Sequence, residues 1–192
     1  MDLKVIIHFK GRDFLNSKRT VFLISGPPGA GKSTLADKIC KSMDGLCVHI
    51  EGDVLYNLVK KGWVHPCDDH DNFFLNVLWD NIVALVENFT QNNMNVVTDY
   101  VFSKEQIFSV IDRMKHLDIN IKIIVIKSDI NILINRDRLR SGIAYVGEER
   151  IRQIVRDFNS NYFPDEFILD NNDADLEGLV DVVLKEDRFT VN

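Results

Sequence analysis

Short apolar runs alternate with amphipathic segments along most of the chain, and this alternation constrains the fold more than any other feature. The apolar runs suit strands that are buried on both faces. In the segments between them, apolar residues recur every three or four positions, as in helices that cover a sheet. Strands are predicted at 20–25, 46–50, 95–98, 121–126 and 166–169, and helices at 32–43, 54–61, 71–89, 104–117, 130–140, 148–159 and 176–184.

Crossover helices between successive strands indicate a parallel sheet covered on both faces. The chain has 192 residues, of which 45% are hydrophobic and 27% charged, as is usual for one globular domain. No linker or repeat divides it, so we expect residues 1–192 to form a single domain. The first 19 residues are harder to interpret, because 5–9 could form either an extra edge strand or a docked extension.

Composition excludes several classes of protein. The net charge of −6 disfavours broad binding to a nucleic-acid backbone, which needs clustered Lys and Arg. Cys40, Cys47 and Cys67 are too few and too loosely spaced for a disulfide framework or a tetrahedral zinc site. Reduced thiols in the cytoplasm are therefore expected. No apolar run approaches twenty residues and the N-terminus lacks the features of a signal peptide, so no membrane partner is expected.

The segment at 26–33 reads GPPGAGKS and fits the pattern G-x-x-x-x-G-K-[ST] at every specified position. A strand precedes it and an amphipathic helix follows it, a context that a chance glycine-rich turn would not need. Glycines allow successive backbone N–H groups to turn inward, and a helix N-terminus adds further donors for phosphate oxygens. The predicted nucleotide-binding residues are Gly26, Pro27, Pro28, Gly29, Ala30, Gly31, Lys32, Ser33 and Thr34.

Within this loop, Lys32 is predicted to reach the β- and γ-phosphates, and Ser33 is predicted to bind Mg²⁺. A phosphate loop predicts a bound nucleotide but not a reaction. The chain contains no Asn-Lys-x-Asp motif for reading a guanine base, which disfavours a GTPase switch.

From about Thr20 to Leu184, the chain resembles the small P-loop kinases, the group that includes shikimate, gluconate, chloramphenicol and adenylate kinase-like enzymes. This resemblance implies a three-layer α/β/α fold with a five-stranded parallel sheet, a central P-loop strand and a short lid. It also implies ATP and Mg²⁺ as cofactors. The activity implied is transfer of a phosphoryl group to a small molecule.

Three acids follow the predicted second and third strands. In similar kinases, an acidic pair like Glu51 and Asp53 lies beside the γ-phosphate, which implies that Glu51 helps hold Mg²⁺ and that Asp53 is the catalytic base. Alternation along an extended chain would put both on the same side. Asp53 could instead cap the helix that follows. Asp99 closes an apolar strand and resembles the acid that orients Mg²⁺, although a turn aspartate in water is the alternative.

Arginines flank a glycine-bounded segment at 141–147, which makes about 136–150 a candidate lid. Arg136 and Arg140 are one helical turn apart and should share a face. By resemblance, Arg136 stacks on adenine, and Arg140 contacts phosphates and takes part in catalysis. Arg152 and Arg156 are weaker candidates for a phosphate role. Charged residues on a helix face in water are the ordinary alternative for all four.

The segment at 61–71, KGWVHPCDDHD, lies where similar kinases bind the acceptor. A metal site there is disfavoured because its histidines lack helical spacing, and Trp63 fits a core anchor or a pocket wall. The favoured function is transfer of the γ-phosphoryl group of Mg-ATP to a hydroxyl of a metabolite or antibiotic. A polynucleotide 5′-hydroxyl kinase or nucleotide kinase is an alternative, and so is a non-catalytic ATP-binding module or regulatory ATPase.

Overall fold

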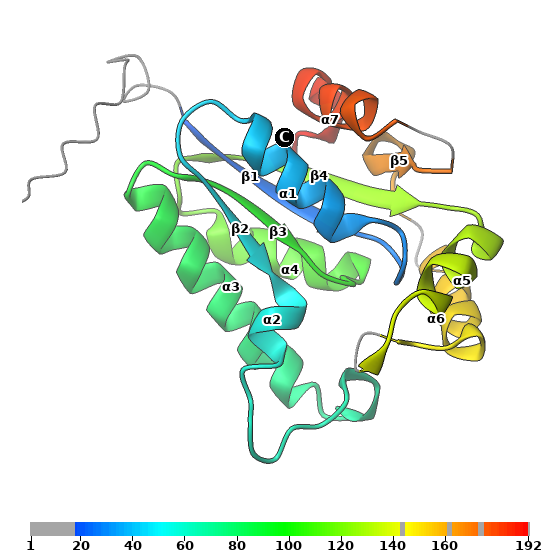
Figure 1. The fold of residues 1–192 in the computed structure, drawn as a ribbon. Coiled ribbons are helices and arrows are strands. Elements are labelled where there is room, and N and C mark those ends of the chain that lie inside the picture. The colour runs from blue at the N-terminus through cyan, green and yellow to red at the C-terminus, as the bar shows by residue number, and fades with distance from the viewer. Residues whose placement is uncertain (1–17, 143–144, 161–162, 173–174, 192) are drawn as a thin grey trace, which may run out of the picture.

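The computed structural model describes residues 18–142, 145–160, 163–172 and 175–191. It contains a five-stranded parallel sheet with helices on both faces, which confirms the predicted three-layer α/β/α fold (Figure 1). The strands are β1 (Arg19–Ser25), β2 (Cys47–Glu51), β3 (Asn95–Asp99), β4 (Ile119–Lys127) and β5 (Ile168–Asp170). The α-helices are α1 (Lys32–Ser42), α2 (Gly52–Tyr56), α3 (Phe73–Gln91), α4 (Lys104–Met114), α5 (Ile130–Arg138), α6 (Glu148–Ser160) and α7 (Leu176–Lys185). The extension or edge strand predicted at 5–9 lies outside the described residues.

The strand order β2-β3-β1-β4-β5 puts β1 at the centre of the sheet, as the resemblance implied. The chain runs from β1 outward to β2, returns to β3, and then crosses over to β4 on the other side of β1. In sheets of this kind, ligands bind in the crevice at the carboxyl ends of the strands where the winding direction reverses. The loop after β1 and the acids after β2 and β3 all lie at this edge (Figure 1).

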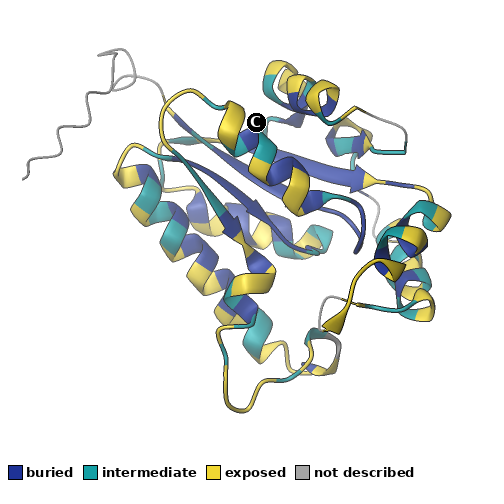
Figure 2. Cartoon of the chain, viewed as in Figure 1, coloured by how far each residue is buried: buried dark blue, intermediate teal, exposed yellow. Residues whose placement is uncertain are grey.

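Alternate residues of the central strands face two separate apolar cores. In β1, Val21 and Leu23 join the core under α3 and α4, whereas Phe22 and Ile24 join the core under α1, α5 and α7. The central strands β1, β3 and most of β4, and the loop between β1 and α1, are consequently buried, whereas the outer helix faces are exposed (Figure 2). The sheet therefore forms a rigid support for the loops at its carboxyl edge.

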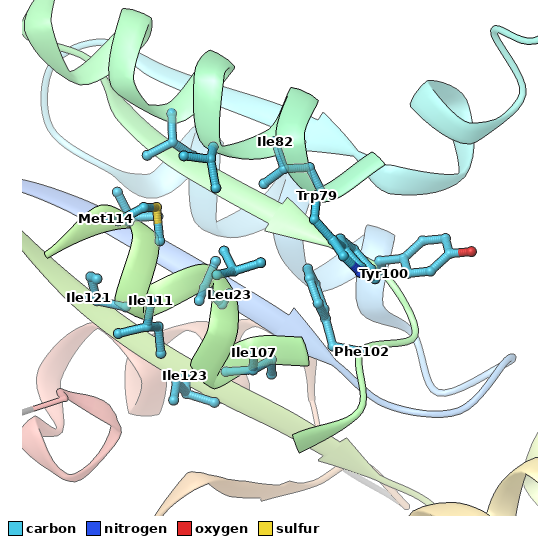
Figure 3. Close-up of a cluster of buried hydrophobic side chains, with 14 of the residues drawn as sticks. Leu23, Trp79, Ile82, Tyr100, Phe102, Ile107, Ile111, Met114, Ile121 and Ile123 are labelled. Carbon is cyan, nitrogen blue, oxygen red and sulfur yellow. The ribbon is translucent and has the colours of Figure 1, made fainter. Parts of the chain in front are cut away.

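An aromatic group closes the first core next to that edge. The ring of Trp79 on α3 stacks on Phe102 at a centroid distance of 4.9 Å, and Tyr100 meets Trp79 edge-on at 5.3 Å. Figure 3 shows that the hydroxyl of Tyr100 points away from the apolar cluster. The segment after β3 is thereby held in place by packing, with one polar group left outside the core.

Several element boundaries differ from the predictions. Helix α2 is Gly52–Tyr56 rather than 54–61, and α5 ends at Arg138 rather than at 140. Helix α4 ends at Met114 rather than at 117, since Leu117 turns back to hydrogen bond with the carbonyl of Met114. The last predicted strand begins as a 3-10 turn, Asp165–Phe167, before β5. Helix ends depend on local capping and tertiary contacts, which apolar periodicity does not encode.

Candidate active site

The phosphate loop, residues 26–31, joins β1 to α1 and has a backbone that requires glycine. Gly29 and Gly31 have φ angles of +82° and +95°, which side chains of L-residues rarely adopt. A Cβ atom on Gly29 would also lie 3.0 Å from the carbonyl oxygen of Leu133 on α5. Inside the loop, the N–H of Ala30 donates to the carbonyl of Pro27 at 3.2 Å. The loop is thus a tight turn that fits closely against α5.

Two side chains from distant elements hold the carbonyl groups of this loop. Arg136 on α5 donates to the carbonyl of Gly29 at 3.2 Å, and Asn171 after β5 donates to that of Ala30 at 2.8 Å. Among the described residues, no side chain caps the N-terminus of α1. Its first N–H groups therefore remain available to an anion. Asn171 is not among the predicted site residues, because Asn is an ordinary turn residue.

Lys32 begins α1 and its side chain is buried, with 9% of the residue exposed. Its ammonium group donates to the carbonyl of Pro27 at 3.2 Å. Burial lowers the pKa of Lys32, while the charges of Asp99 and Asp53 oppose this effect. Two of the three predicted site acids, Asp53 and Asp99, are thus near enough to Lys32 for their charges to act on it. Ser33 and Thr34 follow it in the first, exposed turn of α1.

Asp99, at the end of β3, joins two of the predicted site elements. Its carboxylate is buried, with the residue 4% exposed, and one oxygen accepts a hydrogen bond of 2.7 Å from the hydroxyl of Ser33. These two residues were predicted to bind Mg²⁺, and they are 66 positions apart in the chain. The structure therefore brings Ser33 and Asp99 together, and the alternative of a turn aspartate in water is wrong for Asp99.

His49 on β2 is a site residue that is not among those predicted from the sequence. Its Nε2 atom lies 2.7 Å from the second carboxylate oxygen of Asp99, and its side chain is 15% exposed. Burial alone lowers the pKa of His49, but the hydrogen bond and charge of Asp99 outweigh burial and raise it. Strands β2 and β3 are adjacent, which is what makes the contact possible. A polar residue inside an otherwise apolar strand was the only signal in the sequence.

Asp53 lies in the first turn of α2 and does not cap that helix, whose N-cap residue is Glu51. Asp53 is exposed as a residue, yet desolvation of its carboxyl raises its pKa. The charge of Lys32 opposes this shift and the charge of Asp99 adds to it. Glu51 is exposed and ends β2, directly opposite Asp99 in the register. Because the strand ends at Glu51 and Asp53 lies in α2, strand alternation does not apply to this pair, and their position on one side stays a prediction.

Gly52, between the two acids, permits the close approach of the segment after β3. A Cβ atom at this position would lie 2.7 Å from the Cδ2 atom of Tyr100 and 2.9 Å from the carbonyl oxygen of Asp99. Its backbone conformation is ordinary, so the need for glycine here is entirely steric. Asp53 and Tyr100 are thereby brought near one another, and the charge of Asp53 contributes to a raised pKa of the Tyr100 hydroxyl after desolvation.

The candidate lid is only partly as predicted. Arg140 lies beyond the end of α5, so Arg136 and Arg140 do not share a helical face, and that prediction is wrong. Arg140 is exposed, and its charge acts on both Lys32 and Asp53. Arg136 contacts the phosphate loop as described. Arg136 thus contacts the phosphate loop directly, whereas Arg140 acts on Lys32 and Asp53 through its charge.

A buried carboxylate closes the base of the lid. Asp137, 1% exposed, accepts hydrogen bonds from the backbone N–H groups of Val146 and Gly147 at 3.1 and 2.8 Å. These bonds tie the end of α5 to the start of α6. Outside the lid base, Arg138 and Arg152 both pair with Glu148, whereas Arg156 donates to the side-chain oxygen of Gln153. Arg152 is therefore engaged in an ion pair on its own helix.

The segment after α2 borders a cavity of about 660 Å³ that lies between it and the lid. His65 and Asp68 line one side, and residues from Tyr145 to Arg156 line the other. Trp63 is 38% exposed and meets the rings of Tyr56 and His65 edge-on, so it is not a core anchor. A wall of aromatic side chains thus runs from α2 toward the lid.

The residues at the carboxyl edge fit a magnesium ion that is shared with a nucleotide. Within the described ranges, no group of three or more His, Cys, Asp or Glu side chains could hold a metal ion by itself. The Ser33 hydroxyl and the Asp99 carboxylate provide two hard oxygen ligands at one point. Mg²⁺ in nucleotide sites commonly takes one or two protein oxygens and completes its shell with phosphates and water.

A family model described as an AAA domain matches residues 21–164 of the chain, which is more than half of its length. The chain belongs to this AAA domain family. The match runs from β1 through α6 and includes the phosphate loop, Asp53, Asp99 and the lid base. No curated protein matches the chain significantly.

Solved structures with the same fold include several small kinases. Shikimate kinase from Bacteroides thetaiotaomicron is 16% identical over 88% of this chain and all of its own, with a TM-score of 0.62. A gluconokinase from Sinorhizobium meliloti 1021 is 16% identical over 86% of this chain and 89% of its own, with a TM-score of 0.58. The tunicamycin resistance protein of Deinococcus radiodurans is 14% identical over 86% of this chain and 94% of its own, with a TM-score of 0.59.

At these identities, the comparisons establish the α/β fold of the P-loop kinases for this chain and not its substrate. Among the described helices, none has the combined length and apolar character that crossing a bilayer requires.

Proposed function

We propose that the protein is a kinase that moves the γ-phosphoryl group of Mg-ATP to a hydroxyl of a small molecule. Lys32, Asp53 and Arg140 are the catalytic residues of this proposal. The phosphate loop and Arg136 bind the nucleotide, and Ser33, Asp99 and Glu51 lie on the metal side. The cytoplasmic location and the single domain expected from the sequence belong to the same proposal.

The observation that supports this proposal is that Lys32, in the phosphate loop, feels the charges of two acids that differ in character. Asp99 is buried, and its contacts with Ser33 and His49 fix the orientation of its carboxylate. Asp53 is exposed and has a raised pKa, with desolvation as the main cause. One acid is therefore suited to holding a cation, and the other to meeting an acceptor that arrives from solution.

The proposed chemistry follows from these environments. A carboxylate whose pKa is raised toward the working pH is a better proton acceptor, so Asp53 takes the proton from the acceptor hydroxyl as that oxygen attacks the γ-phosphorus and the bond to the departing ADP breaks. Lys32 and Arg140 offset negative charge on the transferred group. When bound with ATP, Mg²⁺ would neutralise phosphate charge, held by Ser33 and Asp99 with Glu51 as a further acid nearby. The inner N–H groups of the loop and of α1 would orient the phosphates.

The test compares substitutions at the two ends of the site. Lys32→Ala is expected to abolish ATP turnover, whereas Asp53→Asn is expected to lower phosphoryl transfer at least about 100-fold and leave ATP affinity within about twofold. Asp181→Asn, an exposed aspartate on α7, is the matched control. The proposal fails if Lys32→Ala turns over ATP normally. Transfer at the wild-type rate by Asp53→Asn would remove Asp53 from the role of base.

The acceptor that receives the phosphoryl group separates the alternative functions. A polynucleotide or nucleotide kinase would phosphorylate a 5′-hydroxyl oligonucleotide or a nucleoside monophosphate, and the Asp53 dependence would be the same. A non-catalytic ATP-binding module would bind ATP through Lys32 but transfer nothing to any acceptor in a broad screen. The acidic net charge favours the small molecule over the oligonucleotide.

A further inference from the structure

Tyr100 directly follows β3 and carries a hydroxyl group at the edge of the aromatic cluster. The residue is 6% exposed, and its ring meets Trp79 edge-on at 5.3 Å and Phe102 edge-on at 6.1 Å. In Figure 3 the hydroxyl lies at the end of the ring that points away from this cluster. Packing therefore fixes the position of the ring and leaves its polar end outside the core.

This hydroxyl is not paired within the part of the chain that the structure describes. No residue there accepts a hydrogen bond from it. It is not sealed in the core either, because Oγ1 of Thr98 is the one described side-chain atom that is both fully buried and unpaired. Buried tyrosines usually find a partner for their hydroxyl. The Tyr100 hydroxyl is therefore able to donate to a molecule that enters the site.

Tyr100 also borders the proposed base. Gly52 directly precedes Asp53, and a Cβ atom on Gly52 would lie 2.7 Å from the Cδ2 atom of Tyr100. The tyrosine ring thus lies against the backbone of the residue before Asp53. The charge of Asp53 acts on the Tyr100 hydroxyl as well. A molecule with several hydroxyl groups can therefore place one at Asp53 and another at Tyr100.

Tyr56 and Asp69 add to the surroundings of this hydroxyl, because both act on it electrostatically. Tyr56 on α2 is 4% exposed and donates to the carbonyl of Val64 at 3.0 Å. Asp69 is 9% exposed, and one of its oxygens accepts a hydrogen bond of 3.0 Å from the backbone N–H of Leu75 on α3. These contacts hold both side chains in place, so the groups around the hydroxyl are phenols and carboxylates.

The charge on this side of the site is negative. Asp53 and Asp69 act on the Tyr100 hydroxyl, and residues 46–95 contain no arginine. Both lysines of that range are exposed. The cations that act on Asp53 are the two that the proposed function assigns to the transferred phosphoryl group. A carboxylate or phosphate on the acceptor would therefore meet charges of its own sign.

We infer that Tyr100 is a specificity-determining residue, whose hydroxyl donates a hydrogen bond to a second hydroxyl of the acceptor while the first meets Asp53. This inference rests on the proposed kinase function and narrows its substrate class to polyols that are uncharged or cationic. A site that pairs with a hydroxyl rejects a compound without one, because the polar group of the site then stays unpaired.

Substrate class is tested by phosphoryl transfer from labelled ATP to three compounds that share one hydroxylated carbon chain. Sorbitol ends in a hydroxymethyl group, 1-amino-1-deoxysorbitol in a protonated amine, and gluconate in a carboxylate. We expect kcat/KM to be at least about tenfold higher for sorbitol and for the amine than for gluconate. Equal or better transfer to gluconate overturns the inference.

Tyr100→Phe removes the hydroxyl and keeps the ring. We expect it to lower kcat/KM for sorbitol about 3–10-fold, through a higher KM for sorbitol, and to leave the KM for ATP within about twofold. Thr98→Val is the matched control, because it removes an unpaired hydroxyl from the same segment and should leave both KM values within about twofold. An unchanged kcat/KM in Tyr100→Phe overturns the inference, and so does an equal rise in both KM values.

Asp69→Asn tests the role of charge and keeps the inference testable if Tyr100→Phe proves unstable in urea unfolding. Asparagine still offers an oxygen to the N–H of Leu75. We expect the ratio of kcat/KM for sorbitol to that for gluconate to fall at least about threefold. Asp71→Asn, at an exposed aspartate nearby, is the control and should leave this ratio within about twofold. An unchanged ratio in Asp69→Asn contradicts the inference.

Lys32→Ala distinguishes a failure of this inference from a failure of the kinase proposal. If the wild-type protein shows no Lys32-dependent ATP turnover, the kinase proposal fails and the inference fails with it. If ATP turnover depends on Lys32 but none of the three compounds is phosphorylated, or neither Tyr100→Phe nor Asp69→Asn changes their transfer, only the inference about Tyr100 fails.

Discussion

Replacing His49 with alanine tests whether the buried carboxylate of Asp99 depends on its partner in β2. The substitution removes the Nε2 contact of 2.7 Å to an acid that is 4% exposed. Leaving a buried acceptor without its donor costs about 1–3 kcal/mol. We therefore expect His49→Ala to lower the free energy of unfolding by about 2 kcal/mol, which is about a 30-fold change in the unfolding equilibrium.

Asp99 would also become freer to leave Ser33, so we expect a higher Mg²⁺ concentration for half-maximal ATP turnover and a smaller effect on the KM for ATP. Glutamine can present its amide nitrogen near the position of Nε2, whereas asparagine is too short. If His49→Gln, but not His49→Asn, restores the free energy of unfolding and the Mg²⁺ concentration for half-maximal turnover, His49 positions Asp99 and does not merely fill space.

The assay is urea unfolding followed by fluorescence, together with a Mg²⁺ titration of ATP turnover. His116→Ala is the matched control, because His116 is exposed and lies 3.6 Å from Glu87 on the surface. Exposed pairs of this kind contribute about 0–1 kcal/mol. A destabilisation of His49→Ala no larger than that of His116→Ala would refute the reasoning, and so would equal behaviour of the glutamine and asparagine variants.

Three further predictions concern other close contacts. Gly52→Ala should displace the ring of Tyr100, whose Cδ2 atom would lie 2.7 Å from the new Cβ. We expect the free energy of unfolding, measured in urea, to fall by about 1–3 kcal/mol and the rate of phosphoryl transfer to fall as well. Asp137→Ala should cost about 2 kcal/mol or more in the same assay, because it leaves the backbone N–H of Gly147 without its acceptor. Burial raises the pKa of the Cys47 thiol, so iodoacetamide at pH 8 should alkylate it at least about tenfold more slowly than free cysteine, as measured by peptide mass spectrometry.

Each of these has a control. Gly178→Ala on α7 places its Cβ 4.0 Å from the nearest side chain, so it should be neutral or stabilising, and a similar loss there would contradict the steric argument for Gly52. Asp157→Ala replaces an exposed aspartate of α6 and is the control for Asp137→Ala. Equal losses of free energy of unfolding in these two variants would contradict the role given to the Asp137 carboxylate. Alkylation of Cys47 should reach the free-cysteine rate in concentrated urea, and a fast rate in the folded protein would contradict its burial.

Local features of the sequence determined the phosphate loop and the class of fold. The residues of the loop are contiguous in the sequence, so its glycines and Lys32 can be recognised without knowing which other elements pack against them. The same holds for the alternation of apolar runs and amphipathic segments that predicts a parallel sheet. The end of β3 at Asp99 was predictable because buried strands have a clear apolar length. These features depend on residues within one or two elements, where periodicity and backbone sterics suffice.

Only the tertiary structure decided which distant side chains meet at the site. His49 reaches Asp99 across 50 positions because β2 lies beside β3, and Asn171 reaches the phosphate loop across 141 positions because β5 follows β4 at the sheet edge. Arg140 left its expected face because α5 stops at Arg138. Strand order and helix ends result from the packing of the whole chain, and no local pattern encodes them. The phosphate end of the site could therefore be predicted from the sequence, whereas the contacts around Tyr100 could not.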